Sequence, residues 1–472
     1  MVSVNERAQH VVVIGGGPGG YEAALVASSL GAQVSVVDAE GVGGACVLTD
    51  CVPSKALIST AAYVGRVGQA AQMGVRLARE RVRDDNAGVL DADLAAVNAR
   101  ILGLAQAQSE DIRAGLEERG VRVIRGRGRL SGPARVHVEP EGEAAYDVEA
   151  DMILLATGAA PRVMDTARPD GERILTWQQV WALPEVPEHL IVVGSGVTGA
   201  ELAQAYLGMG SRVTLVSSRE HVLPGEDQDA AQVIEDVFRE RGMVVLNRSR
   251  MSAVRREGAG VAVELEDGRV IEGSHALLAV GSVPRTEGLG LAEAGVALSP
   301  RGHIEVDRVS RTSVRGVYAA GDCTGVLPLA SVAAMQGRIA VAHALGDAVA
   351  PLNIRGVASN IFTDPEIATV GLSQSDVEGM SDVRQIMMPL ATNARAKMDN
   401  LATGFVKLFA RSGSNQLVGG VVVAPRASEL IFPIALAVGQ RLTVDQVAAT
   451  ITVYPSLSGS IAEAARRLHA VD

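Results

Sequence analysis

The sequence has few cysteines, few lysines and few aromatic side chains for its 472 residues. Three cysteines in so long a chain, Cys46, Cys51 and Cys323, cannot build the disulfide scaffold that is typical of small secreted proteins. A cysteine pair here would therefore point to redox chemistry. Lysine occurs only three times, while arginine is abundant, so Lys55 stands out within a cysteine-containing motif.

Positive charge is also in deficit, because the formal net charge is -11 at pH 7. That sign disfavours binding to nucleic-acid phosphates and to anionic lipid. The sequence contains no uninterrupted apolar run of about 18 residues, and its start lacks an apolar signal core. No His/Cys/Asp cluster has the spacing of metal ligands. We therefore expect a soluble, cytoplasmic protein with no nucleic-acid partner, no integral membrane segment and no metal site.

Hydrophobic residues make up 47% of the chain, which is enough for folding by burial. Its length favours about three or four domains. The segment 10–38 runs from an apolar strand through a glycine turn and a helix to a second strand, and 190–217 repeats that order. Residues 90–119 read as a helix, and 121–148 as short strands. The pattern predicts an α/β fold with two Rossmann-like dinucleotide-binding domains.

The first glycine turn, with Gly15, Gly17 and Gly20, follows a strand and opens a helix. Asp38 ends the next strand, eighteen residues after Gly20. Glycines at this spacing let a pyrophosphate approach the helix N-terminus, and the acid can accept ribose hydroxyl groups. This context favours a cofactor site over a plain glycine-rich turn.

The second glycine turn consists of Gly194, Gly196 and Gly199 in the same context. The strand after it ends in Ser217, Ser218 and Arg219, where an NAD-binding domain would have an acid. A carboxylate there would repel a ribose 2′-phosphate, whereas hydroxyls and a guanidinium tolerate or attract it. We predict that NADPH is used at least as well as NADH. The alternative is a solvated turn in which Arg219 has no role.

Cys46 and Cys51 lie in GGACVLTDCVPSK, with four residues between them. Two sulfurs at this spacing near a helix start can bond only if the turn is distorted, because disulfide geometry is narrow. Spacing alone therefore leaves both a redox pair and two buried structural thiols open.

At these motifs the chain resembles the FAD-dependent pyridine nucleotide-disulfide oxidoreductases, which include dihydrolipoamide dehydrogenase, glutathione reductase and mercuric reductase. The resemblance covers essentially the whole chain. Its carriers, in the family's order, are IGGGPGGYEAA, GGACVLTDCVPSK, LLATGAAPR, VVGSGVTGAELA, VYAAGDC and FTDPEIATVG.

The resemblance implies that Cys46 is the outer sulfur of a redox pair, facing the substrate, and Cys51 the inner one, next to the flavin. It implies an ion pair of Lys55 and Glu201 beside the flavin, where a cation favours negative charge on the reduced ring. Two unrelated surface charges are the alternative for that pair. Asp322 would hold the ribityl chain, and Gly321 would let the backbone come close.

The resemblance also assigns residues to each nucleotide. FAD would be bound by Gly15, Gly17, Gly20, Asp38, Gly44, Lys55, Thr157, Gly158, Gly321 and Asp322. NADPH or NADH would be bound by Gly194, Gly196, Gly199, Glu201, Ser217, Ser218, Arg219 and Gly281.

The C-terminal motif departs from the family. Its disulfide-reducing members carry a histidine before a proline and a glutamate five residues later, whereas Tyr454 and Gly459 occupy those places here. A neutral phenol is a poor base at pH 7, and losing a general acid-base typically costs a factor of about 10² to 10⁴ in rate. Asp50, where the family has glycine, would disfavour the Cys51 thiolate if its carboxylate points at the sulfur.

Both departures argue against efficient disulfide turnover, while neither residue is needed for hydride transfer to FAD. A quinone can accept electrons directly, and the TVYPSLSG ending resembles that of the actinobacterial NAD(P)H quinone reductases of this family. We therefore predict an FAD-dependent NAD(P)H:quinone oxidoreductase. Because Cys46 and Cys51 are both present, a disulfide reductase such as dihydrolipoamide dehydrogenase is the first alternative.

A flavin-based redox sensor with little turnover is the alternative from another class. A mercuric reductase is disfavoured, because the C-terminus has no cysteine pair to capture a soft metal.

We expect a split FAD domain over 1–157 and 289–346, an NAD(P) domain over 158–288, and an α+β interface domain over 347–472. By resemblance, the last domain pairs two subunits. Tyr454, the remaining candidate catalytic residue, would then face Cys46 of the partner subunit.

Overall fold

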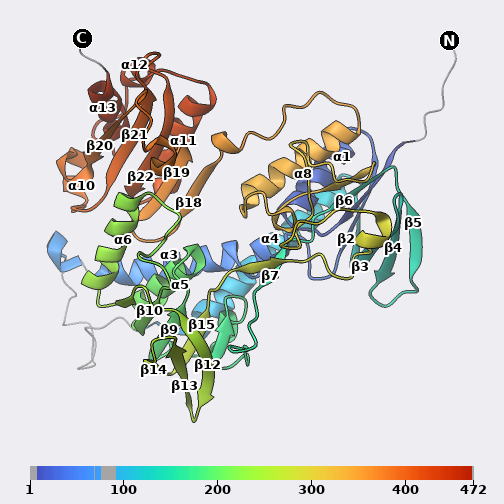
Figure 1. Ribbon diagram of the computed structural model, residues 1–472, viewed down its shortest axis with the longest axis horizontal. Helices are drawn as coiled ribbons and strands as arrows, with labels where there is room; N and C mark the ends of the chain where they lie inside the picture. Colours follow the sequence, from blue (N-terminus) through green and yellow to red (C-terminus); the bar gives the residue numbers. More distant parts are fainter. Residues whose placement is uncertain (1–7, 69, 76–91, 470–472) are drawn as a thin grey trace. The chain divides into compact units, whose positions relative to one another are not determined.

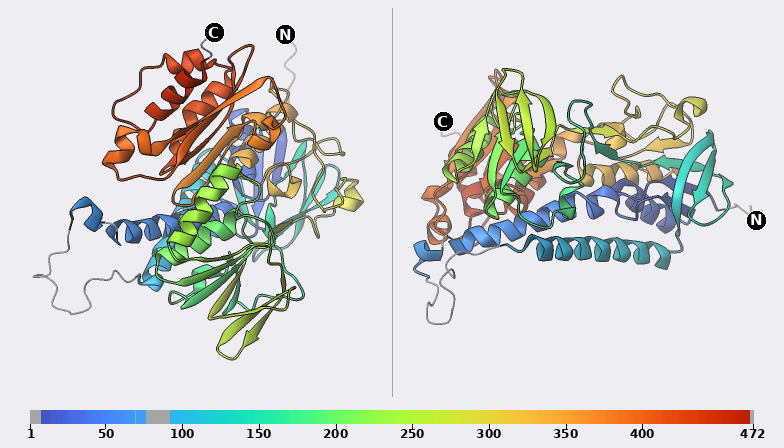
Figure 2. Two further views of the ribbon diagram at one scale, coloured as in Figure 1. Left: turned by 60° about the vertical axis from the view of Figure 1, so that its left-hand side comes forward. Right: turned by 90° about the horizontal axis from the view of Figure 1, so that it is seen from below.

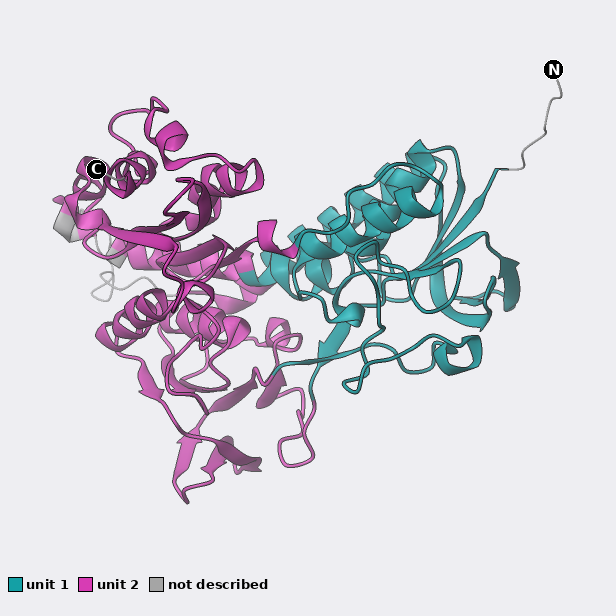
Figure 3. Ribbon diagram, turned by 45° about the horizontal axis from the view of Figure 1, so that its top comes forward, with its two compact units in different colours: residues 1–54, 99–162, 281–353 teal, residues 55–98, 163–280, 354–472 magenta. Residues whose placement is uncertain are grey.

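The computed structural model describes residues 8–68, 70–75 and 92–469, as Figure 1 shows with the remainder in grey. The chain divides into two compact units (Figure 3). Unit 1 comprises residues 1–54, 99–162 and 281–353, and unit 2 comprises residues 55–98, 163–280 and 354–472.

Unit 1 is built on one mixed sheet. Among the described residues its strand order is β17 (Val317–Ala319), β6 (Met152–Leu155), β1 (His10–Ile14), β2 (Gln33–Asp38), β3 (Arg122–Gly132), β4 (Arg135–Pro140) and β5 (Tyr146–Glu149). The strands from β17 to β3 are parallel, and β3, β4 and β5 form an antiparallel meander at one edge. The predicted excursion of short strands is this meander (Figure 1).

The parallel part of this sheet is buried on both faces. Val11 and Val13 of β1 pack against α1 and α8, while Val12 and Ile14 face the other side and pack with β4. The remaining elements that lie wholly or mainly in unit 1 are α1 (Pro18–Ser29), α2 (Gly44–Leu48), α4 (Leu94–Glu118), β7 (Ala159–Pro161), β16 (Ser282–Pro284), α7 (Leu291–Ala294), η4 (Asp322–Thr324) and α8 (Ala330–Ala344). Helix α4, seen along its length in Figure 2, is the helix expected over 90–119; residues 90 and 91 lie outside the described residues.

Unit 2 contains a second parallel sheet. Its described order is β11 (Val244–Leu246), β10 (Arg212–Val216), β9 (His189–Val193), β15 (His275–Leu278) and β8 (Ile174–Thr176). An antiparallel meander packs on it, with β12 (Met251–Glu257), β13 (Gly260–Leu265) and β14 (Val270–Gly273). The helices of this part are α3 (Cys51–Gly68), η1 (Ala70–Met73), η3 (Val180–Ala182), α5 (Val197–Gly208) and α6 (Gln228–Glu240).

The C-terminal part of unit 2 is an antiparallel sheet covered by helices. Its described order is β18 (Ala358–Ile361), β19 (Glu366–Gly371), β22 (Leu417–Ala424), β21 (Phe405–Arg411) and β20 (Val383–Pro389). Two helices, α11 (Ala427–Gly439) and α13 (Gly459–Leu468), cover one face and share its apolar core. The shorter helices are η5 (Ile354–Gly356), α9 (Gln374–Val377), η6 (Leu390–Thr392), α10 (Ala394–Met398) and α12 (Val444–Ala448).

These elements confirm the predicted α/β class, with two parallel sheets in Rossmann-like βαβ order and an α+β C-terminal part. The two units follow compactness and not the predicted domain limits, so the boundaries at 157, 288 and 346 stay predictions. Within the described ranges, no helix has both the length and the apolar character that a membrane span requires.

Candidate active site

The first glycine turn joins β1 to α1 in unit 1. Gly15 has a φ of +103°, and a Cβ built on it would lie 2.2 Å from the Ala156 carbonyl oxygen. A Cβ on Gly20 would lie 1.9 Å from the carbonyl oxygen of Gly15. At Gly17, the N-cap of α1, a Cβ would meet nothing within 4 Å. Two glycines are thus needed for packing, and the third leaves open space at a helix N-terminus, where a pyrophosphate fits.

Asp38 lies at the end of β2, as the sequence predicts. Its Oδ2 accepts the Gly16 N–H at 2.6 Å, and its Oδ1 accepts the N–H groups of Glu40 at 2.8 Å and Gly41 at 2.6 Å. The carboxylate is therefore fixed beside the glycine turn by three backbone donors. Each carboxylate oxygen can accept more than one hydrogen bond, so capacity for ribose hydroxyls is left.

Five other predicted FAD residues lie in unit 1, the last of them Asp322. A Cβ on Gly44, whose φ is +58°, would lie 2.9 Å from the Gly17 Cα, so Gly44 closes onto the glycine turn. The Thr157 hydroxyl donates to the Arg285 carbonyl at 2.6 Å, and Gly158 has a φ of +70°. Gly321, with a φ of +82°, donates its N–H to Gln336 at 2.9 Å.

Asp322 follows Gly321 and opens the short helix η4. Burial, and secondly the charge of Asp50, raise the pKa of Asp322 to about 6. Asp50 therefore lies close enough to repel a charge at Asp322. Its predicted influence on Cys51 stays a prediction.

The two motif cysteines lie in neighbouring helices. Cys46 is in α2 and Cys51 is the first residue of α3, and both are partly buried. The N–H groups of Thr49 and Asp50 bond the Ala45 carbonyl at 3.0 and 2.8 Å, so a tight turn links the two helices. The third cysteine, Cys323, is fully buried, and burial raises its pKa to about 11.

Lys55 and Glu201 meet in unit 2. The Lys55 Nζ lies 2.8 Å from Glu201 Oε2, and the glutamate side chain is only 3% exposed. Glu201 Oε1 accepts the N–H of Phe362 at 2.8 Å, and the ring of Phe362 lies 5.1 Å from the ammonium. The ion pair expected from the family resemblance is therefore formed. Lys55 is also one helical turn after Cys51 in α3.

The second glycine turn repeats the first. A Cβ on Gly194 would lie 2.2 Å from the Ala279 carbonyl oxygen, and one on Gly199 would lie 1.9 Å from that of Gly194. A Cβ on Gly196, the N-cap of α5, would meet nothing within 4 Å. Gly281, the last predicted NAD(P) residue, has a φ of +96° and lies at the start of the third segment of unit 1.

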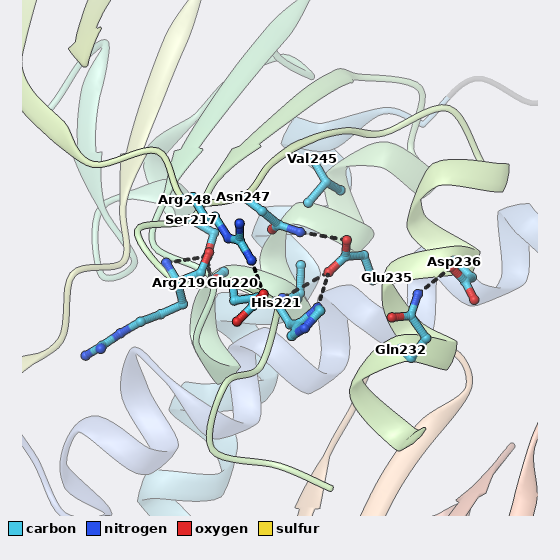
Figure 4. Close-up of polar contacts among 12 residues, drawn as sticks. Ser217, Arg219, Glu220, His221, Gln232, Glu235, Asp236, Val245, Asn247 and Arg248 are labelled. Carbon is cyan, nitrogen blue, oxygen red and sulfur yellow. Dashed lines mark hydrogen bonds and ion pairs between the residues drawn. The ribbon is translucent and has the colours of Figure 1, made fainter. Parts of the chain in front are cut away.

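The turn after β10 differs from the sequence-based expectation at one residue. Ser217 is fully buried, and its hydroxyl lies 2.7 Å from that of Ser195 in the glycine turn. Ser218 and Arg219 are exposed, and the Arg219 side chain points away from the other labelled residues in Figure 4. A serine contact thus links the ends of β9 and β10, and of the three predicted residues only Ser218 and Arg219 are exposed.

Tyr454 lies between α12 and α13 and is 86% exposed. Ile451 and Val453 in the same segment are also largely exposed. Gly459 is the first residue of α13. Within the part of the chain that the structure describes, no group of three or more His, Cys, Asp or Glu side chains could hold a metal ion.

Two polar clusters were not predicted from the sequence. Glu235 is buried in α6 and contacts the turn after β10, and Lys407 in β21 is buried against Asp227. A sequence signal existed for Lys407, which is a rare lysine inside an apolar strand. Glu235 gave none, because a glutamate in an amphipathic helix reads as a surface residue.

The matches to known protein families cover both glycine turns and the C-terminal sheet. Residues 9–337 match the pyridine nucleotide-disulphide oxidoreductases, and residues 357–465 match the dimerisation domain of the same family. The chain belongs to this family. As a member it is an FAD-dependent oxidoreductase that uses a nicotinamide dinucleotide, and the two glycine turns fit those two nucleotides.

Two curated relatives illustrate the range of the family. The chain is 53% identical to an NAD(P)H dehydrogenase (quinone) of Mycobacterium tuberculosis, over 98% of this chain and 94% of that protein. It is 34% identical to a dihydrolipoyl dehydrogenase of Haloferax volcanii, over 96% of this chain and 95% of that protein.

Solved structures agree with the fold. The crystal structure of LpdA from Mycobacterium tuberculosis matches with a TM-score of 0.92 at 52% identity, over 98% of this chain and all of that one. The flavoprotein disulfide reductase RclA from Escherichia coli matches with a TM-score of 0.84 at 22% identity, over 97% and 99% of the two chains, which shows the shared fold alone.

Proposed function

We propose that this oxidoreductase passes electrons from NADPH or NADH through FAD to a quinone. The single observation that carries the choice of acceptor is the C-terminal segment, where an exposed tyrosine, Tyr454, and Gly459 replace a histidine and a glutamate. A relative at 53% identity that is named NAD(P)H dehydrogenase (quinone) supports the proposal.

Bound FAD would carry the two electrons, and this chain would hold both the FAD and the nicotinamide dinucleotide. The N-termini of α1 and α5 would each take a pyrophosphate, and Asp38 a ribose. Lys55, held by Glu201, would stabilise negative charge on the reduced ring. The net reaction consumes NADPH, a proton and a quinone, and yields NADP⁺ and a quinol. Quinone reduction involves no sulfur exchange, so it does not require a base at position 454.

A disulfide reductase is the second candidate, because the chain has both Cys46 and Cys51 in the family's motif. A turn from Ala45 brings the two helices that carry them together.

The proposed function also includes a nucleotide preference. Exposed Ser218 and Arg219 after β10 favour use of NADPH at least as well as NADH.

We also propose a homodimer through the C-terminal part. Residues 357–465 match the family's dimerisation domain, and several large apolar side chains there are exposed, namely Phe432, Leu436, Ile451, Val453 and Tyr454. A second copy of the chain would cover them and set Tyr454 against Cys46 of the partner subunit. A fully active monomer would contradict this arrangement. The cytoplasmic location stays a prediction.

The test compares acceptors at steady state. The wild-type protein and Cys46→Ser are assayed with NADPH and a naphthoquinone, and with NADH and lipoamide. We expect fast quinone reduction that survives Cys46→Ser within about twofold, and lipoamide turnover lower by a factor of about 10² or more because the acid-base pair is missing. Rapid lipoamide turnover that Cys46→Ser abolishes would establish the disulfide reductase instead.

A further inference from the structure

Glu235 is a charged side chain buried in the nucleotide-binding part of unit 2. It lies in the middle of α6 and is 5% exposed, among the apolar residues with which that helix packs. Burying a carboxylate costs several kcal/mol, by the usual order of magnitude, unless hydrogen bonds compensate for the lost water. An acid at this position therefore calls for partners, and the structure provides them.

The carboxylate of Glu235 receives donors from both sides. Oε1 accepts the Asn247 Nδ2 at 2.7 Å and a guanidinium nitrogen of Arg239 at 2.7 Å. Oε2 accepts the Val222 N–H at 3.2 Å and lies 3.9 Å from the Nδ1 of His221 (Figure 4). Although burial acts to raise it, these hydrogen bonds hold the pKa of Glu235 below its ordinary value, so the group is ionised at neutral pH.

These partners belong to two chain segments that meet at the end of β10. Val222 and His221 lie in the turn 217–223, which follows β10, and Asn247 follows β11. The next two residues after Asn247 bind that turn as well. The Arg248 N–H donates to the Arg219 carbonyl at 2.8 Å, and the Ser249 N–H donates to the Ser217 carbonyl at 2.7 Å. Glu235 therefore contacts both segments and holds them together.

The charges of this turn are unevenly distributed. Its acid, Glu220, forms an ion pair with Arg248, which keeps that carboxylate beside a cation. Arg219 is exposed, and no hydrogen bond or ion pair of its guanidinium is found among the described residues. His221 is about half exposed and lies against Glu235. The turn thus presents Arg219 and His221 outward with its own acid neutralised.

We propose that Glu235 is a positioning residue for dinucleotide specificity, which fixes the turn 217–223 so that Arg219 and His221 face a phosphate on the adenosine ribose. The proposal rests on the proposed function, because it takes this turn as the site of a nicotinamide dinucleotide. The fold alone would be satisfied by an apolar residue at 235. A carboxylate at 235 does more than pack α6, because its hydrogen bonds also fix the position of the turn 217–223.

The experiment replaces the carboxylate of Glu235 by an amide of nearly the same shape. For Glu235→Gln, steady-state kinetics with a naphthoquinone should show the ratio of kcat/KM for NADPH to that for NADH falling about tenfold. The KM for the quinone and the kcat should stay within twofold. Inhibition by 2′,5′-ADP should weaken about tenfold, and inhibition by 5′-AMP less than twofold. Glu240→Gln, at an exposed glutamate at the end of the same helix, is the matched control and should change none of these.

An unchanged nucleotide ratio in folded Glu235→Gln, or an equal loss for NADPH and NADH, overturns the proposal. If Glu235→Gln does not fold, Asn247→Ala removes one of the hydrogen bonds to Glu235 and should lower the same ratio of kcat/KM values. An unchanged ratio in Asn247→Ala would then also overturn the proposal. Failure of the wild-type protein to oxidise either nucleotide would count against the proposed function and not against the role of Glu235.

Discussion

At the scale of single residues, the pair Asp50 and Asp322 has an unfavourable charge arrangement in unit 1. Burial, and then Asp50, raise the pKa of Asp322 to about 6. A carboxyl group whose folded pKa is raised contributes stability that is fully present below its unfolded pKa of about 4 and is lost as the pH rises through about 6. Above pH 6 the flavin-free protein therefore holds an unfavourable negative charge at this turn.

We predict that Asp50→Asn stabilises the flavin-free protein above pH 6, because it removes one of the two causes and keeps the side chain's size and carbonyl oxygen. The expected gain is about 1 kcal/mol, the order of a like-charge interaction in a partly solvated site. It should vanish near pH 4, where Asp322 is protonated in both proteins. Thermal unfolding midpoints at pH 4 and pH 7.5 measure the effect. A gain of equal size at both pH values would contradict it.

Residue types could be predicted from the sequence more readily than side-chain directions. The resemblance gave the pairing of Lys55 with Glu201, and the 2.8 Å contact confirms it. The turn after β10 was also placed correctly, but its Ser217 is buried against Ser195. Which way a serine turns depends on a neighbour 22 residues away, and neither propensity nor spacing contains that information.

At the scale of the elements, the two glycine turns show how one motif combines packing with binding. In the second turn, Gly199 lies against a backbone carbonyl oxygen, so an added Cβ would force a 1.9 Å contact. Gly196 has a φ of -72°, which any residue adopts, and space above it. Gly199 is therefore structural, whereas Gly196 leaves room for a ligand at the helix N-terminus.

We predict opposite results for two alanine variants in this turn. Gly199→Ala should lower the thermal midpoint, by an amount that corresponds to about 1–3 kcal/mol, because overpacking moves α5 from β9. Gly196→Ala should leave the midpoint unchanged and weaken NADP⁺ binding about tenfold, since its methyl group occupies the approach of the pyrophosphate. Calorimetric titration and thermal scans separate the two effects. Wild-type affinity in Gly196→Ala would remove the pyrophosphate from this helix end.

The periodic elements were predictable because each βαβ unit lies within about thirty residues and carries its own glycine turn. Helix α6 shows the limit of such patterns. Its buried face includes Ile234 and Phe238, so the period identifies the helix, but the acid at 235 reads as an ordinary surface residue. Only the strand ends that converge on it in the folded chain explain why it is inside.

At the scale of the whole molecule, unit 2 joins its nucleotide-binding part to its C-terminal sheet through a buried ion cluster. The Nζ of Lys407 in β21 lies 2.8 and 2.7 Å from the two carboxylate oxygens of Asp227, and 2.6 Å from Asp229. The side chains of Lys407 and Asp227 are 3% and 2% exposed. Asp227 is also the N-cap of α6, the helix that carries Glu235. The order of motifs predicted both parts, but a contact across 180 positions has no sequence signature.

We predict that Lys407→Met destabilises the protein by about 3–5 kcal/mol, because removal of one partner leaves the Asp227 carboxylate buried and uncompensated. The double variant Lys407→Met with Asp227→Asn should recover part of that loss, since the buried charge is then gone while the asparagine still caps α6. Lys397→Met, at an exposed lysine of the same C-terminal part, is the control and should leave the thermal midpoint unchanged. If the single and double variants are equally destabilised, the loss comes from packing around Phe405 and β21. If the single variant matches the wild type, the cluster does not hold the two parts together, and the position of α6 is set by its apolar face alone.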